Sequence, residues 1–161
     1  MQRRFWIGMS IGLAGVLAGS ATVADISPGK ISAFASIVEQ NPLPGYGATL
    51  VSATIGKGRA KRALSIHATL NIRGAGATVV GILPRVNGVS AEPNRVVTDC
   101  TSHAECSVSG NWYLDVDAAE LANPDAFVNE PLLVELIGGE ISLATPAIPW
   151  DATLSVLMVK K

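Results

Sequence analysis

The two cysteines of the chain lie close together, and a histidine stands midway between them. Cys100 and Cys106 enclose a short polar segment with His103 at its centre. Two thiolates and an imidazole are ligands that zinc and copper favour, so one interpretation is a metal-binding envelope protein. An oxidising compartment outside the cytoplasm would instead join such close thiols. We predict a Cys100–Cys106 disulfide that pins a loop between two strands, with no metal ligands and no bound cofactor.

Acidic residues gather in the C-terminal half, where Asp115 and Asp117 lie two positions apart. Most glycoside hydrolases use two carboxyl groups for catalysis, so one alternative is a secreted, glycan-directed hydrolase. Together with Asp125 the two acids also resemble a calcium loop, but Glu120 occupies the sixth position, where an EF-hand requires glycine. The simpler interpretation is that these acids cap a short helix and face solvent.

A basic, glycine-containing segment and an aromatic pair offer binding groups instead of catalytic ones. The segment from Gly56 to Arg62 lacks the Gly-Lys-Ser/Thr ending of a phosphate loop, so we expect a solvated hairpin tip. A tryptophan next to a tyrosine suits sugar stacking, although a tryptophan in a small sandwich usually belongs to the core. The candidate binding surface comprises Lys57, Arg59, Lys61, Arg62, Trp112 and Tyr113. The partners that fit it are a polysaccharide or another envelope protein.

Composition narrows the function classes. The chain has 161 residues, 12 Lys+Arg against 13 Asp+Glu, and 2 His, which corresponds to about one domain with a net charge of -1. Such a balance lacks the positive field of a nucleic-acid binder. Two histidines, one in the cysteine loop and one on a strand, give no Ser-His-Asp spacing. We therefore expect a protein that is not an enzyme.

The N-terminus has the order of a secretory signal peptide. Arg3 and Arg4 precede an apolar run from Phe5 to Ala18, and small residues follow. Cleavage after Ala24 leaves a mature domain of residues 25–161 that is secreted or periplasmic and has no membrane segment. Cleavage after Ala21, or retention of residues 1–24 as an anchor, remains an alternative.

Beyond residue 30 the apolar residues follow the period of strands. The clearest alternation runs from Ala63 to Ile72, where leucine, isoleucine and alanine alternate with Ser65, His67, Thr69 and Asn71. Asn87-Gly88 between two valines predicts a tight hairpin. One helical turn is expected over Asp117–Ala122, capped by Asp115 or Asp117 and stopped by Pro124. The expected strands are Ile31–Val38, Tyr46–Ile55, Ala63–Ile72, Ala77–Val86, Arg95–Thr98, Cys106–Ser109, Trp112–Val116, Leu132–Ile137 and Thr153–Val159.

Short strands with turns at close spacing predict an all-β fold, an antiparallel β-sandwich of immunoglobulin-like or jelly-roll type. The stretch from Cys106 to Glu120, with the later Asn123-Pro124 and 129–132 and the earlier Val86-Asn87-Gly88, resembles segments of uncharacterised secreted bacterial proteins. The resemblance implies a recurring exported β domain and no site residues. Our leading hypothesis is an exported, non-enzymatic module with a binding or structural role at the bacterial envelope or outside the cell.

Overall fold

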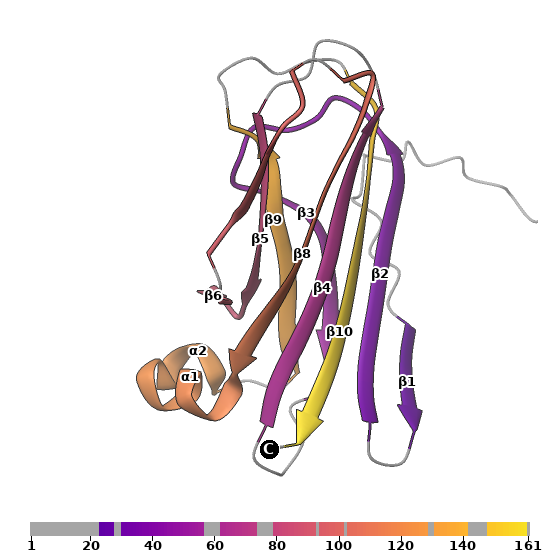
Figure 1. Ribbon diagram of the computed structural model, residues 1–161. Helices are drawn as coiled ribbons and strands as arrows, with labels where there is room; N and C mark the ends of the chain where they lie inside the picture. Colours follow the sequence, from indigo (N-terminus) through magenta and orange to yellow (C-terminus); the bar gives the residue numbers. More distant parts are fainter. Residues whose placement is uncertain are drawn as a thin grey trace, which may run out of the picture.

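The chain forms two antiparallel sheets that face each other, with two short helices at one end (Figure 1). The computed structural model describes residues 23–27, 30–56, 62–73, 79–92, 94–101, 103–128, 131–141 and 148–160. Sheet A contains, in spatial order, β1 (Val23–Ser27), β2 (Lys30–Gln40), β10 (Trp150–Lys160), β4 (Arg62–Arg73) and β8 (Glu105–Asp115). Sheet B contains β3 (Ala48–Ile55), β9 (Leu132–Glu140), β5 (Val79–Val86) and β6 (Val89–Ser90), and β7 (Val96–Asp99) also pairs with β5. The predicted antiparallel β-sandwich is confirmed.

The hydrophobic core lies between the sheets because each long strand points alternate side chains inward. In β4 every second residue from Leu64 to Ile72 is buried, as the alternation of the sequence predicted. Sheet B contributes the facing layer. The largest buried side chains are Phe127, Leu43, Leu50, Ile55, Leu64, Ile66, Leu70, Ile72, Ile82, Leu132, Leu136 and Leu154. Backbone ladders hold β10, β4 and β8 side by side, and the core covers one side of sheet A, so the other side faces outward.

The Asn87-Gly88 hairpin forms where it was predicted. Both residues have positive φ, 47° and 84°, and Val86 pairs with Val89 across the turn. Pro84, expected at an edge or a bulge, is buried inside sheet B opposite Leu136. On the other side of β5, residues 79–82 pair with β7 and residues 85–86 pair with β6. Pro84 lies between these two ladders, so its missing N–H interrupts neither of them.

Several boundaries differ from the predicted ones. The strands expected to form a hairpin through Gly56–Arg62 lie in different sheets, β3 in sheet B and β4 in sheet A, so they do not pair with each other. The two strands expected around Gly110 are one continuous strand, β8. Asp115 caps α1 (Val116–Ala122), and Pro124 begins a second helix, α2 (Pro124–Phe127), since proline fits the first turn of a helix.

The predicted signal peptide falls almost entirely on residues 1–22, which lie outside the described residues. The first described strand, β1, begins at Val23, and its first two residues pair with Phe34 and Ala33 of β2. Within the described part of the chain, no helix is long and apolar enough to cross a membrane.

Candidate functional site on the outward face of sheet A

The cysteine loop forms the predicted disulfide. Cys100 and Cys106 are bonded, with their Cα atoms 5.7 Å apart, and Cys100 is fully buried. Because both sulfurs are in the disulfide, neither is a thiolate that can join His103 in binding a metal. The described residues contain no group of three or more His, Cys, Asp or Glu side chains arranged to hold a metal ion. In the same loop, hydrogen bonds from the Thr101 hydroxyl and backbone N–H lower the pKa of Asp99.

The acids considered for hydrolysis have structural partners. The Asp115 carboxylate accepts a hydrogen bond from the Ala118 N–H at 3.1 Å, which caps α1. Asp117 accepts the backbone N–H of Arg62 at 3.0 Å and also its guanidinium, which reaches Glu120 at 2.9 Å. Residues that are far apart in the sequence therefore neutralise one another where β4 begins beside α1.

The six residues of the predicted binding surface do not form one patch. Lys57, Arg59 and Lys61 lie outside the described residues. Arg62 is held by the acids of α1, with a side chain only 12% exposed. Trp112 points into the core, where its indole N–H donates to the Asn94 carbonyl at 3.3 Å, so its ring is not open to a ligand. Tyr113, the next residue along β8, points outward and is 49% exposed.

Tyr113 belongs to a broad polar surface on the outward side of sheet A. The strand register aligns Ser65 with Tyr113, His67 with Asn111, Thr69 with Ser109, and Asn71 with Ser107. Next to them on β10 lie Ser155, opposite His67, and Thr153, opposite Thr69. We call this surface the polar face; its uncharged polar and aromatic residues are Phe34, Ser36, Ser65, His67, Thr69, Asn71, Ser107, Ser109, Asn111, Tyr113, Thr153 and Ser155, and the outward β10 residues Asp151 and Leu157 complete its two end rows.

Charge is absent from the middle of the polar face. In the Thr69, His67 and Ser65 rows, the outward positions described on β10, β4 and β8 carry no Asp, Glu, Lys or Arg, and in the Asn71 row the Asp151 carboxylate of β10 is paired with Arg73. Hydroxyl and amide groups both donate and accept hydrogen bonds without a net charge. With the usual strand spacings, the face measures about 14 Å across its four strands and about 20 Å along β8.

Two exposed aromatic rings flank the polar face. Tyr113 lies on β8 at one side, and Phe34, 47% exposed, lies on β2 at the other. A backbone bridge fixes Tyr113 in place: its N–H donates to the Glu92 carbonyl at 2.7 Å and its own carbonyl accepts from Glu92 at 3.1 Å. Exposed rings offer flat apolar surfaces for stacking.

Core packing supports the middle of the face from beneath. Gly110 leaves room for the Trp112 ring, since a Cβ at position 110 would come within 2.5 Å of it. Opposite Gly110 on β4 lies the buried Ala68. On the outward side, the His67 ring nitrogen Nδ1 lies 3.0 Å from the Asn111 Oδ1, which links the two strands across the face.

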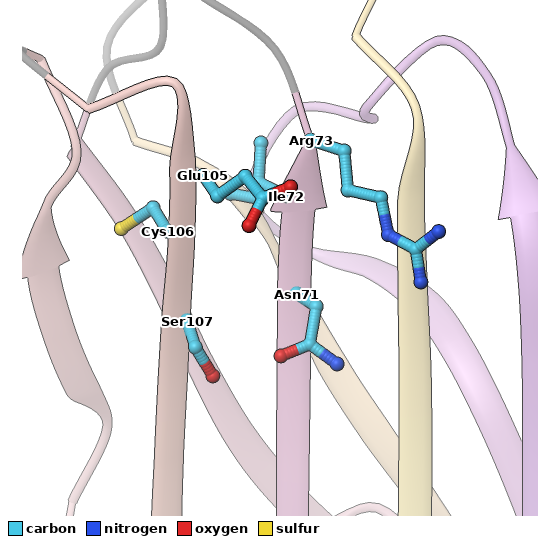
Figure 2. A pocket seen from close by; sticks show the side chains of 6 residues that line it. All are labelled: Asn71, Ile72, Arg73, Glu105, Cys106 and Ser107. Carbon is cyan, nitrogen blue, oxygen red and sulfur yellow. The ribbon is translucent and has the colours of Figure 1, made fainter.

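A hollow of about 320 Å³ lies at the disulfide end of the polar face. It is lined by Asn71, Ile72, Arg73, Glu105, Cys106 and Ser107 (Figure 2). Arg73 and Glu105 are opposite each other in the register of β4 and β8, yet Figure 2 shows the guanidinium extending away from Glu105 over β10. There it pairs with Asp151 at 2.5 Å, and this buried carboxylate also accepts the Glu39 N–H.

The sequence identified one strand of this surface and missed the rest. The alternation in β4 predicts the polar side of Ser65 to Asn71, and the Trp112-Tyr113 pair indicates an aromatic residue for stacking. The contributions of β2 and β10, and most of β8, depend on which strands become neighbours, which alternation alone does not specify. A detectable signal was the run of small polar residues at alternate positions, Ser107, Ser109 and Asn111.

No protein-family model and no curated protein sequence matches the chain. The solved structures that match the chain include structures of infectious bursal disease virus. The VP2 subviral particle is 16% identical, with a TM-score of 0.43 over 94% of this chain and 37% of that chain. The Gt strain structure is 14% identical, with a TM-score of 0.42 over 89% of this chain and 39% of that chain. This chain spans well under half of each, and at these scores the fold assignment rests on the two sheets themselves.

Proposed function

We propose that the chain is an exported, non-enzymatic β-sandwich module that binds a neutral polysaccharide at the bacterial envelope or outside the cell. The observation that carries this proposal is the polar face, which combines uncharged hydroxyl and amide groups with two exposed rings. Polysaccharides present the same hydroxyl chemistry, and their ring faces stack on aromatic side chains. A nucleic acid is a poor match, because the face has no cations to neutralise phosphates.

The acids support a binding role over a hydrolytic one. A glycosidase needs two carboxylates directed at a bound sugar. In this chain Asp115 caps α1 and Asp117 pairs with Arg62, so both carboxylates contribute to the structure.

Retention of the purified chain on insoluble polysaccharides tests the binding proposal. We expect it to bind at least one neutral polymer among cellulose, chitin, β-1,3-glucan and mannan. Replacing Tyr113 by alanine should weaken that binding by about three- to tenfold, because a stacking contact is lost. Phe34→Ala should weaken it similarly, whereas Tyr113→Phe keeps the ring and should bind nearly as wild type.

Leu121→Ala is the matched control, since Leu121 is an apolar side chain 87% exposed on α1, outside the polar face. Equal retention of the Tyr113→Ala, Phe34→Ala and Leu121→Ala variants would show that the face does not bind. Release of reducing ends from the bound polymer, abolished by Asp115→Asn or Asp117→Asn, would favour the hydrolase alternative.

Export is tested separately. When the full chain is produced in a bacterium, we expect the protein in the periplasmic or secreted fraction, with an N-terminus that begins at Asp25. Cleavage there would shorten β1 by the two residues that pair with Phe34 and Ala33. An intact leader in the membrane fraction would contradict cleavage and support the anchor alternative.

A further inference from the structure

We propose that the hollow at the end of the polar face binds a protonated amino group, such as the ammonium of an amino sugar. This inference rests on the proposed binding of glycans, since the hollow opens beside the Asn71–Ser107 row of the face. The hollow would select a positively charged sugar unit, whereas the uncharged middle of the polar face would not distinguish it from a neutral one.

The charges around the hollow carry the argument. Arg73 turns over β10 to the Asp151 carboxylate, whose side chain is only 8% exposed, so these two groups neutralise each other. The exposed Glu105 lies directly across from Arg73, and no cation of the described chain pairs with it. Glu105 therefore leaves an excess negative charge at the rim of the hollow.

The remaining polar groups suit a sugar. Asn71 and Ser107 are neighbours on β4 and β8, and in Figure 2 their side chains lie below the Glu105 carboxylate on the same side of the sheet. The Asn71 amide and the Ser107 hydroxyl can form hydrogen bonds with the hydroxyl groups of a sugar ring. The Glu105 carboxylate can accept a charge-assisted hydrogen bond from an ammonium group.

The position of Glu105 is fixed by the covalent structure beside it. The next residue, Cys106, lines the hollow and is held by the disulfide to Cys100. Glu105 also belongs to β8, whose register with β4 is continuous from Arg73 to Ala63. The carboxylate is thus carried by an ordered strand end, which lowers the entropic cost of presenting it to a ligand.

Titration with monosaccharides, monitored through backbone amide shifts, tests the hollow independently of the polymer. We expect glucosamine to shift the amides of residues 71–73 and 105–107 and to bind about tenfold tighter than glucose, because one charge-assisted hydrogen bond is added. N-acetylglucosamine, which has no ammonium group, should bind like glucose. Glu105→Gln keeps the shape of the side chain and should abolish the preference.

Glu135→Gln makes the same change of charge on sheet B and should leave the preference intact. Equal affinity for glucosamine and glucose, a preference that persists in Glu105→Gln, or no shift at these amides would each overturn the inference. Polymer retention, measured on the Tyr113→Ala variant alongside the monosaccharide titration, separates the two proposals. If the hollow shows no preference while Tyr113→Ala still loses the polymer, only the amino-sugar inference fails.

Discussion

At the scale of single residues, Asn87 shows how one side chain joins a turn to its surroundings. Its φ of 47° lies in the left-handed region, which asparagine tolerates better than most residues. Its amide donates to the Ala126 carbonyl at 2.9 Å, and its side-chain oxygen accepts the Leu133 N–H at 2.8 Å. The residue that signalled the hairpin in the sequence therefore also ties the hairpin to α2 and β9.

We expect Asn87→Ala to lower the free energy of unfolding by about 2 kcal/mol, because two hydrogen bonds are lost and the backbone is strained. Asn87→Gly loses the same bonds but relaxes the backbone, so it should cost about 1 kcal/mol. Urea denaturation measures both, with the exposed Ser90→Ala as a control in β6. An Asn87→Ala variant as stable as wild type would refute this account of the turn.

At the scale of elements, the inward half of sheet A was easier to predict than its outward half. Buried and exposed residues alternate regularly in β4 because its leucine, isoleucine and alanine side chains all face the same core. This alternation is visible in the sequence. In β8, Gly110 interrupts the apolar pattern, which on its own predicts two strands. The structure shows why the interruption is harmless: the Trp112 ring fills the space above Gly110.

Strand partners were the part that the sequence did not determine. β3 and β4 follow each other with a glycine-containing connection, which is the usual mark of a hairpin. Each of the two strands has one apolar side, which could face the core either from the same sheet or from opposite sheets. In the structure the two strands lie in different sheets. The polar face was missed for the same reason, because it exists only when β2, β10, β4 and β8 are adjacent.

At the scale of the whole molecule, two cations of the basic region, Arg62 and Arg73, are paired with acids that are distant in the sequence. The sequence collects cations near residues 57–73 and acids in the C-terminal half. Folding brings Arg62 to Asp117 and Glu120, and Arg73 to Asp151, at opposite ends of β4. The ion pairs thus lie at the two ends of sheet A, and the middle of its outward side is left neutral, which is the property that the proposed ligand requires.

The disulfide also acts at this scale, because it joins the end of β7 in sheet B to β8 in sheet A. The loop it closes is short, so the chain-entropy contribution is only ~2 kcal/mol. Most of the core residues lie away from it, along the strands of both sheets. We therefore expect the reduced protein to remain folded and to unfold at a lower urea concentration, by an amount that corresponds to ~2 kcal/mol.

Thiol labelling without reductant should find no free cysteine, and circular dichroism before and after reduction checks that the sheets persist. The polar face should still retain polysaccharide, since Tyr113 lies in the Ser65 row and Phe34 in the His67 row, both away from the disulfide, which adjoins the Ile72 end of β4. The preference for glucosamine should weaken, because Glu105 loses its covalent anchor at Cys106. Complete unfolding on reduction in the absence of urea would instead show that the disulfide, and not the apolar core, holds the two sheets together.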